Sequence, residues 1–364
     1  MSSKKDKFSA IDRFYMTLAK NLAKRNIGIT NENPSVGCVI VKNNKIISYS
    51  TTNQSGRPHA ETLAIKRAKE SVKGSTVYLT LEPCSHFGKT PPCTKALIRS
   101  KVKKVIYSIN DPDDRTTNKA KFKFKQHKIK TYSGLMSSDI NRIYSKYIYC
   151  KTNKMPYVTG KIACTKNYRF FYNNIKLTNS HSQSVSHLLR YYNQAIITSY
   201  KTINSDNPRL TCRLNGLKKF SPIVIIIDRN LKSNLKMNIF NKNHPNKLII
   251  FHKSKNKQKI NKFKHTGCRL YEIVENFNYN DFLISVLKKI YLLKINTVLV
   301  ECGKLLTAEF INKGLINEFY LFKGSKKSEL SRESILNITK KLDKSYKKKV
   351  VDTFVSNDRI IKYY

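Results

Sequence analysis

Two neighbouring stretches decide the organisation of the first part of the chain: PHAETLAIKRA at residues 58–68 and TLEPCSHFGKTPPC at residues 80–93. The first has the apolar spacing of a helix, and the second begins in a run of residues that is typical of a buried strand. Together they place four chemically active side chains close to one another along the sequence: His59, Glu61, Cys84 and Cys93.

Strands and helices are expected to alternate around these stretches. Apolar residues recur on one helical stripe over residues 11–25, and two apolar runs flank Asn43 and Asn44, which predicts a β-hairpin. The further elements are expected in the order helix 59–72, strand 75–82, helix 94–100 and strand 103–110. This alternation predicts a three-layer α/β/α domain, which we place at residues 1–150.

The second part of the chain has the same alternating character. Strand-like runs recur at residues 157–164, 194–199, 222–228, 247–252 and 296–301. Helical segments lie between several of them, including residues 186–192 and 281–293. We therefore expect a second α/β domain over residues 155–364, with the boundary in the polar stretch near 150–156.

The net charge of +47 is extreme and allows two interpretations. One is a protein that binds nucleic acid through its positive field. The other is a genome with A/T-rich codons, because lysine, asparagine, isoleucine and tyrosine are abundant while tryptophan is absent. We favour the second interpretation, since the lysines lie along the whole chain and form no single basic block. A positive field would still attract an anionic substrate.

The apolar residues are distributed as in a protein without a membrane anchor. The sequence has no run of about eighteen apolar residues, and its charged start lacks the apolar segment of a secretory signal. We therefore expect a cytoplasmic protein with no membrane partner. In a reducing compartment the eight cysteines should be core residues, catalytic groups or metal ligands, and should not form disulfides.

The four side chains named first match the requirements of a catalytic zinc site. Such a site takes three protein ligands and one water, and His59, Cys84 and Cys93 supply three suitable donors. Zinc lowers the pKa of its water towards neutrality, and the carboxylate of Glu61 could pass the proton to a departing amine. A His-x-Glu motif followed by Pro-Cys and a second cysteine is the pattern of zinc deaminases. Each residue alone could be structural, but the four in this order favour the zinc site.

The spacing between the cysteines is unusual and sharpens this interpretation. Eight residues, SHFGKTPP, separate Cys84 from Cys93, whereas nucleic-acid and nucleoside deaminases usually have two. This insert, together with NENPSVGCVIV at 31–41 and SGRPHAE at 55–61, closely resembles the bifunctional riboflavin-biosynthesis deaminase/reductase family. The resemblance covers nearly the whole chain and is most specific over residues 31–112.

The resemblance implies a cytidine-deaminase-like domain followed by a reductase domain with a dihydrofolate-reductase-like fold. It also implies two consecutive reactions on a phosphorylated pyrimidine. The first is the zinc-dependent hydrolytic deamination of a diaminopyrimidinone ribosylamino phosphate. The second is the reduction of the ribosyl group to a ribityl chain by NADPH. The resemblance also suggests a homo-oligomer, which the sequence itself does not establish.

The family pattern assigns roles to individual residues. In the first domain Glu61 is the catalytic acid and base, the zinc ligands are His59, Cys84 and Cys93, and the implied substrate contacts are Asn33 and Lys89. In the second domain the implied substrate contacts are Arg190, Leu210, Arg213 and Glu301. The implied NADPH contacts are Ala163, Thr202, Asp206 and Gly303. Structural alternatives stay open for several of these, since Asn33 precedes a proline and Lys89, Arg190 and Arg213 could be ordinary surface charges.

The second domain departs from the family pattern at several places. TKNY stands at residues 165–168 in place of the usual Ser-Leu-Asp-Gly, and Asn174 and Lys176 stand in place of a Ser-x-Trp motif. Lys304 follows Gly303 in place of proline or glycine. The stretch LFKGSKKSEL at 321–330 also departs from the strand and loop that the family has there. Loss of the tryptophan would remove an apolar wall near the nicotinamide.

Two alternative functions therefore stand beside the bifunctional enzyme. One is a deaminase whose second domain is only a structural partner. The other is a nucleic-acid-editing deaminase, which the charge suggests and which the cysteine spacing and the large second domain disfavour. The sequence has no aromatic RNA-binding motif, so we expect no specific nucleic-acid partner.

Overall fold

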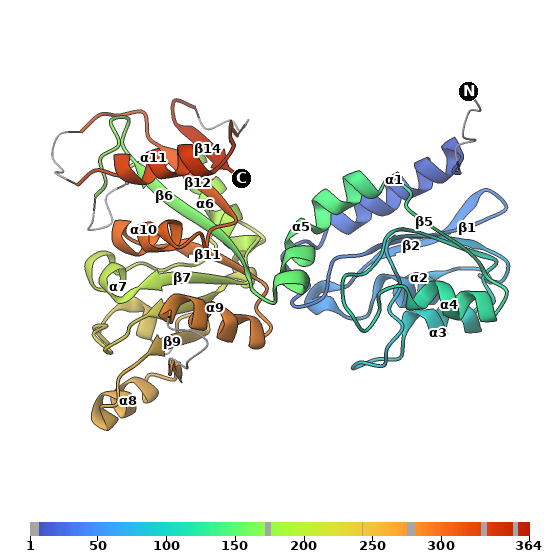
Figure 1. Ribbon diagram of the computed structural model, residues 1–364, viewed down its shortest axis with the longest axis horizontal. Helices are drawn as coiled ribbons and strands as arrows, with labels where there is room; N and C mark the ends of the chain where they lie inside the picture. The colour runs from blue at the N-terminus through green and yellow to red at the C-terminus, as the bar shows by residue number, and fades with distance from the viewer. Residues whose placement is uncertain (1–6, 172–175, 242, 275–280, 329–332, 352–355) are drawn as a thin grey trace. The chain divides into compact units, whose positions relative to one another are not determined.

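The computed structural model describes residues 7–171, 176–241, 243–274, 281–328, 333–351 and 356–364. The chain forms two compact units, Met1–Lys154 and Met155–Tyr364. Each unit is built on one sheet with helices on both faces (Figure 1). The two units are described separately below.

The first unit contains a five-stranded sheet in the order β2-β1-β3-β4-β5. Its strands are β1 (Gly37–Lys42), β2 (Lys45–Thr51), β3 (Thr76–Leu81), β4 (Lys104–Ile109) and β5 (Lys130–Ser133). Its helices are α1 (Ala10–Lys24), α2 (Ala60–Arg67), α3 (Cys93–Arg99), α4 (Lys119–Gln126) and α5 (Ser137–Asn153), with a 3-10 turn at Gln54–Gly56. Strands β3, β4 and β5 are parallel, while β1 is antiparallel to both of its neighbours.

The expected hairpin is present and its turn explains the sequence there. β1 and β2 are antiparallel and are joined at Asn43 and Asn44, which have φ angles of 49° and 59°. Asparagine tolerates positive φ better than most residues, and two such residues in a row form the turn that matches the twist of a hairpin. This short connection fixes the register of the edge strand.

Helices cover both faces of the first sheet. Figure 1 shows α1 and α5 on one side and α2, α3 and α4 on the other. The α1 side buries Tyr15 and Met16 against Tyr78 and Ile106, and the opposite side buries Ala64 and other small and apolar residues. Helix α1 lies directly against β1, because a Cβ atom at Gly37 would come within 1.9 Å of the Ala19 carbonyl oxygen.

The second unit contains a nine-stranded sheet in the order β10-β9-β8-β7-β11-β6-β12-β14-β13. The strands are β6 (Tyr157–Cys164), β7 (Ala195–Ser199), β8 (Ile223–Ile227), β9 (Leu248–His252), β10 (Arg269–Glu272), β11 (Thr297–Glu301), β12 (Glu318–Lys323), β13 (Lys348–Val350) and β14 (Arg359–Tyr363). All pairings from β10 to β12 are parallel, and β14 and β13 add an antiparallel edge.

Six helices and two 3-10 turns complete the described part of this unit. They are α6 (Ser180–Tyr191), α7 (Tyr200–Asp206), α8 (Lys257–Lys264), α9 (Phe282–Leu292), α10 (Lys304–Asn312), α11 (Leu336–Ser345), Lys218–Phe220 and Asn238–Phe240. Successive strand residues point to opposite faces, so Ile197 packs in the core beneath α9, α10 and α11, and Ile196 in the core beneath α6, α7 and α8. The unit is therefore an α/β domain, as the sequence predicts, and its helices lie in layers on both faces of the sheet.

The sequence predictions hold best for the buried strands. Those expected at 75–82, 103–110, 157–164, 194–199, 222–228, 247–252 and 296–301 are all present as β3, β4, β6, β7, β8, β9 and β11. The helix expected over 59–72 is too long in the prediction, because α2 ends at Arg67 and Ala68 is extended. All eight cysteines are free thiols. In the described part of the chain, every helix is too short or too polar to span a membrane.

Candidate active sites

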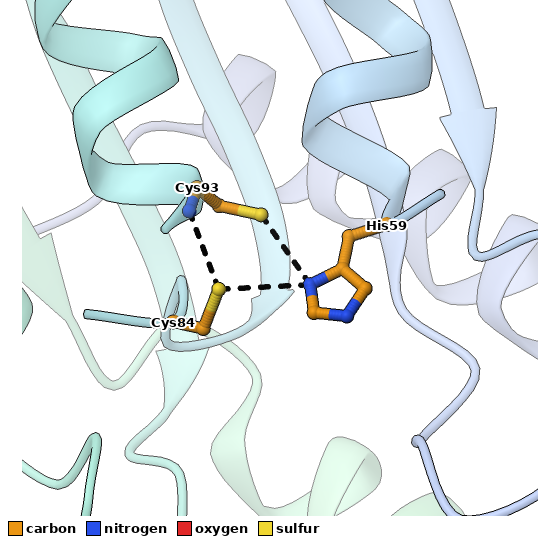
Figure 2. A group of neighbouring side chains, drawn as sticks. All are labelled: His59, Cys84 and Cys93. Carbon is orange, nitrogen blue, oxygen red and sulfur yellow. Dashed lines mark hydrogen bonds between the residues drawn. The ribbon is translucent and has the colours of Figure 1, made fainter. Parts of the chain in front are cut away.

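The three expected zinc ligands come from three different element ends in the first unit. His59 is the residue before the first turn of α2, Cys84 follows the C-terminal end of β3, and Cys93 opens α3 after Pro92. The backbone N–H of Cys93 donates to the Cys84 sulfur at 3.2 Å, which holds the two cysteines together. The fold thus brings the three side chains, which are separated in sequence, together in one cluster (Figure 2).

The distances within this cluster suit a tetrahedral zinc ion. His59 Nδ1 lies 3.6 Å from Cys84 Sγ and 3.4 Å from Cys93 Sγ, and all three donor atoms lie within 4.8 Å of one another. A zinc ion with ordinary Zn–N and Zn–S bond lengths would hold such atoms about 3.5 Å apart. Among the described residues these three form the only group of metal-binding side chains this compact. The donor set therefore fits zinc, with a fourth position left for water or substrate.

The chemical states of the nearby groups agree with this role. The hydrogen bond from Cys93 lowers the pKa of the Cys84 thiol to about 4 against the opposing effect of burial, and His59 adds to the lowering. A cysteine binds a metal as its thiolate, and the lowered pKa favours that form at Cys84. Glu61 lies in the first turn of α2 with only 3% of its surface exposed, and burial raises the pKa of its carboxyl while His59 opposes the shift. A buried carboxylate beside the donor cluster is well placed to carry a proton.

A second group of residues surrounds the loop between the two cysteines. Lys89 is exposed on this loop, which is compatible both with the predicted phosphate contact and with an ordinary solvated lysine. Arg57 donates from Nη1 to the Thr90 hydroxyl at 2.6 Å, so a second cation stands beside the same loop. A Cβ atom at Gly88 would lie 3.4 Å from Arg57 Nη2, so the guanidinium also lies close to the backbone of this loop. Arg57 was not predicted, although its position directly before Pro58 and His59 was a usable signal.

Asn33 lies beside the backbone that leads into His59. Its side-chain nitrogen donates to the Gly56 carbonyl oxygen at 3.0 Å, and its own N–H donates to the Thr30 carbonyl oxygen. One of the two N–H donors of the side-chain amide is thus used by the protein. Its amide oxygen has no hydrogen-bond partner among the described residues, and it is the atom that could accept from a heterocycle.

In the second unit the eight residues expected to bind substrate or NADPH all line one cavity of about 320 Å³. They come from β6, α6, α7, the loop after α7, the end of β11 and the residue before α10: Ala163, Arg190, Thr202, Asp206, Leu210, Arg213, Glu301 and Gly303. The cavity lies at the carboxyl ends of the parallel strands β6 and β11, where ligands bind in open α/β sheets.

A buried ion network forms one wall of this cavity. Arg190 donates from Nε and Nη2 to the two carboxylate oxygens of Glu301 at 2.9 and 2.8 Å, and from Nη1 to the Thr211 carbonyl oxygen at 3.0 Å. Lys161 Nζ lies 3.3 Å from the same carboxylate. Burial alone would raise the pKa of Glu301, but the two cations hold it well below its usual range. Each of the three guanidinium nitrogens of Arg190 therefore donates a hydrogen bond within the protein. Lys161 is a site residue that the sequence did not indicate.

The turn before α10 is fixed in a similar way. The Gly303 N–H donates to the Thr202 hydroxyl at 3.0 Å, and the Ser199 hydroxyl lies 3.0 Å from the same oxygen. Two residues expected to contact the cofactor thus contact each other across a sequence separation of 101. The N–H of Gly303 is not free for a phosphate, but the turn that carries it is held rigidly at the edge of the cavity.

Two family models match the sequence, one in each unit. Residues 9–109 match the cytidine and deoxycytidylate deaminase zinc-binding region, and residues 160–326 match the RibD C-terminal domain. The riboflavin biosynthesis protein RibD of Aquifex aeolicus is 34% identical over 315 residues, which is 86% of each chain. The chain belongs to the RibD family. RibD of Escherichia coli is 30% identical over 323 residues, which is 85% of this chain and 87% of that protein.

Solved RibD structures have the same fold over nearly the whole chain. Acinetobacter baumannii RibD matches with a TM-score of 0.83 and 26% identity, and the match covers 97% of this chain and 98% of that one. The Thermotoga maritima deaminase/reductase matches with a TM-score of 0.81 and 28% identity at the same coverage. The resemblance drawn from the motifs is thereby confirmed, together with the deaminase-like and reductase-like folds.

The RibD reductase cavity survives the departures in sequence. The four residues of TKNY at 165–168 form a tight turn and do not line it. Lys176 does line it, but so do Phe170 and Phe171, which still supply aromatic surface to the cavity. Asn174 lies outside the described residues. The two cofactors of a RibD enzyme, zinc and NADPH, therefore each have a site with suitable residues in this chain.

Proposed function

We propose that this RibD protein performs both reactions of a bifunctional deaminase/reductase in riboflavin biosynthesis. The first unit would deaminate diaminohydroxyphosphoribosylaminopyrimidine by hydrolysis, and the second would reduce the ribosyl side chain of the product to ribityl. The observation that carries the proposal is the coexistence of a zinc-compatible His-Cys-Cys cluster and an intact polar cavity, each within its own unit.

In the deamination step, water adds to the amine-bearing ring carbon and ammonia leaves. Zinc would be held by His59, Cys84 and Cys93, and it would supply a Lewis acid that makes water acidic enough to lose a proton near neutral pH. The Glu61 carboxylate accepts that proton and returns it to the departing nitrogen, which a buried carboxylate next to the cluster can do. Asn33 orients the pyrimidine through its amide oxygen, and Lys89 and Arg57 attract the phosphate.

In the reduction step, one hydride and one proton add to the ribosyl group. NADPH supplies the hydride when it is bound. Glu301 is held in one orientation by Arg190 and Lys161, and it offers a fixed carboxylate to the sugar hydroxyls. Arg190 therefore positions Glu301, while Arg213, which also lines the cavity, is the arginine proposed to meet the substrate phosphate. Thr202, Asp206, Ala163 and Gly303 form the edge proposed for the cofactor.

The proposal extends to the setting in which the enzyme works. Its substrate is a small phosphorylated pyrimidine, and no specific nucleic-acid or membrane partner is needed for either step. We propose that it acts in the cytoplasm as a homo-oligomer, in line with the free state of all eight cysteines and with its family. Size-exclusion chromatography with light scattering would test the oligomeric state.

The test is a coupled assay on the full-length protein, with and without its metal. Zinc-loaded protein should release ammonia from the pyrimidine substrate and then oxidise NADPH. Protein stripped with a chelator should lose deamination but should still oxidise NADPH when it is given the deaminated intermediate, and added zinc should restore the first step. Deamination without NADPH oxidation would contradict the second half of the proposal. Metal-independent deamination would contradict the first half.

A further inference from the structure

A second hollow lies beside the reductase cavity and has a different chemical character. It has a volume of about 510 Å³, which is within the range of small-molecule sites. Three cationic side chains line it, Arg209, Arg213 and Lys218, together with hydroxyl and amide groups such as those of Ser221 and Asn241. None of the described residues that line it is acidic. Arg213 is the one residue that lines both this hollow and the reductase cavity.

The cations of the hollow are not neutralised within the described part of the protein. No carboxylate forms an ion pair with Arg209, Arg213 or Lys218 there, since the nearby Glu301 is held by Arg190 and Lys161. Partial desolvation lowers the pKa of Arg213, whose side chain is still exposed, and the charges of Arg190 and Arg209 lower it further. Cations that repel one another without a counter-ion favour the binding of an anion.

The wall of the hollow is held in an unusual backbone conformation. Leu210 has a φ of 49°, a left-handed conformation that costs a leucine about 1 kcal/mol or more. Two side chains secure this kink, because His244 bonds the Arg209 carbonyl oxygen at 3.0 Å and Asn246 donates to the Leu210 carbonyl oxygen at 3.1 Å. The kink turns Leu210 towards the reductase cavity, while Arg209 on one side of it lines the hollow.

The opposite wall is tied to the same segment. The Cys212 N–H donates to the Ser221 hydroxyl at 3.1 Å, and that hydroxyl donates to the Lys218 carbonyl oxygen at 2.9 Å. The backbones that carry Arg209, Arg213 and Lys218 are therefore linked to one another by hydrogen bonds. The side chains of all three are themselves exposed, so these hydrogen bonds fix where the cations start and leave their charged ends open to an anion.

We propose that this hollow is a phosphate-binding site, with Arg209, Arg213 and Lys218 as its cationic ligands. The guanidinium forks suit the oxygens of a phosphate monoester, and the amides and hydroxyls suit the uncharged polar part of such a molecule. The phosphate has two possible sources, the phosphorylated ligand of the reductase cavity or a separate phosphate ester. Arg213 is also the residue proposed above to meet the substrate phosphate, so the first of these sources rests on the proposed function, whereas the second does not.

The test measures phosphate binding to the full-length, zinc-loaded protein by isothermal titration calorimetry at constant ionic strength. The probe is inorganic phosphate, and the variant is Arg209→Gln combined with Lys218→Gln, neither of which lines the reductase cavity. The matched control is Lys219→Gln combined with Arg269→Gln, which removes the same two charges from exposed positions outside the hollow. We expect the variant to weaken binding about tenfold or more and the control to change it less than about twofold.

A second titration identifies the source of the phosphate. If ribose 5-phosphate displaces the inorganic phosphate, the hollow receives the phosphate of the reductase ligand. If both bind together to one chain, the hollow serves a separate phosphate ester, and either result supports the site. Equal weakening in the variant and the control would overturn the proposal, because it would mean diffuse attraction to a basic surface. Absence of phosphate binding to the unmodified protein would overturn it as well.

Discussion

The two active sites of this chain are built in opposite ways. The deaminase cluster takes its three metal donors from within one short stretch of sequence, and helix and strand ends bring them together. The eight residues expected to bind ligands in the reductase cavity come from six separate places, and Lys161 and Glu301 in its wall lie 140 residues apart. The first site is held by donor atoms around a common centre, and the second by a network of buried charges.

This difference determines what each site tolerates. A metal cluster needs particular donor atoms at particular distances, so few substitutions are compatible with it. A cavity assembled by a parallel sheet keeps its shape as long as the strands keep their order. Phe170 and Phe171 still line it although Lys176 stands where the family has tryptophan. The second unit can therefore vary further in sequence than the first while its cavity remains.

The largest effect is expected at Glu61. Replacing it with glutamine should lower the rate of deamination about a thousandfold, because the proton carrier is lost while the zinc donors stay. Reduction of the deaminated intermediate should not change, since that site is in the other unit. Stopped assays of ammonia release, with zinc content measured in parallel, check this result. The control is Glu70→Gln, an exposed residue beyond α2, and a variant at Glu61 that kept its activity would remove the carboxylate from the mechanism.

The ion network of the second unit should give the next largest effect. Glu301→Gln leaves Arg190 and Lys161 buried without a counter-charge, and we expect the free energy of unfolding of this unit to fall by about 3 kcal/mol. Glu309→Gln breaks the exposed pair with Arg229 and should cost less than about 1 kcal/mol. Urea unfolding followed by circular dichroism measures both. Equal losses in the two variants would show that the network contributes no more than a surface pair.

The free energy of unfolding should depend on pH through His187, a residue that lines the reductase cavity. Burial, and then the charges of Arg190 and Arg213, lower the pKa of His187 from 6.5 to about 4, while Glu301 opposes the shift. The unfolded chain therefore binds a proton that the folded chain excludes between these two values. The free energy of unfolding should therefore be highest above pH 6.5. It should fall by about 2 kcal/mol as the pH falls towards 4.

The measurement for His187 is the difference in unfolding free energy between the unmodified protein and His187→Gln across this pH range. Other groups titrate in both proteins and cancel in the difference. We expect the unmodified protein to lose more stability than the variant as the medium becomes acidic. Parallel curves would mean that His187 has an ordinary pKa in the folded protein.

The smallest effect is expected at the mouth of the deaminase site. Lys89→Gln should raise the KM for deamination about fivefold with little change in kcat, because the ammonium attracts the phosphate and does not take part in the chemistry. Lys95→Gln, on the exposed face of α3, is the matched control. Steady-state kinetics at low and high salt would check it, since screening should shrink the effect. A drop in kcat alone would contradict a role limited to binding.

The sequence was most informative where chemistry or local geometry restricts the choice of residue. The zinc donors could be read from residue type and spacing, and the hairpin from two consecutive asparagines. The buried strands could be read because their faces are apolar. Helix α5 (Ser137–Asn153) was not predicted, since its stripe mixes tyrosines with polar residues and the residue before it, Met136, offers no capping side chain.

The contacts that build the reductase wall could not be derived from the sequence. The order of the sheet places β11 beside β6, and only this neighbourhood brings Lys161 to Glu301. The family pattern pointed to Arg190 as a substrate contact, but it could not reveal that all three guanidinium nitrogens donate hydrogen bonds to Glu301 or Thr211. Which arginine is free for a ligand depends on partners that are distant in the chain.

The position of β11 also sets the order in which the chain can mature on the ribosome. Both neighbours of β6 in the sheet, β11 and β12, are synthesised after β7, β8 and β9. β6 therefore cannot pair with either neighbour until most of the second unit has been made. The zinc donors, in contrast, are complete once Cys93 has emerged. A nascent chain halted before β11 would therefore carry a folded first unit and an unfinished second sheet, whose apolar strands would need protection from aggregation until synthesis resumes.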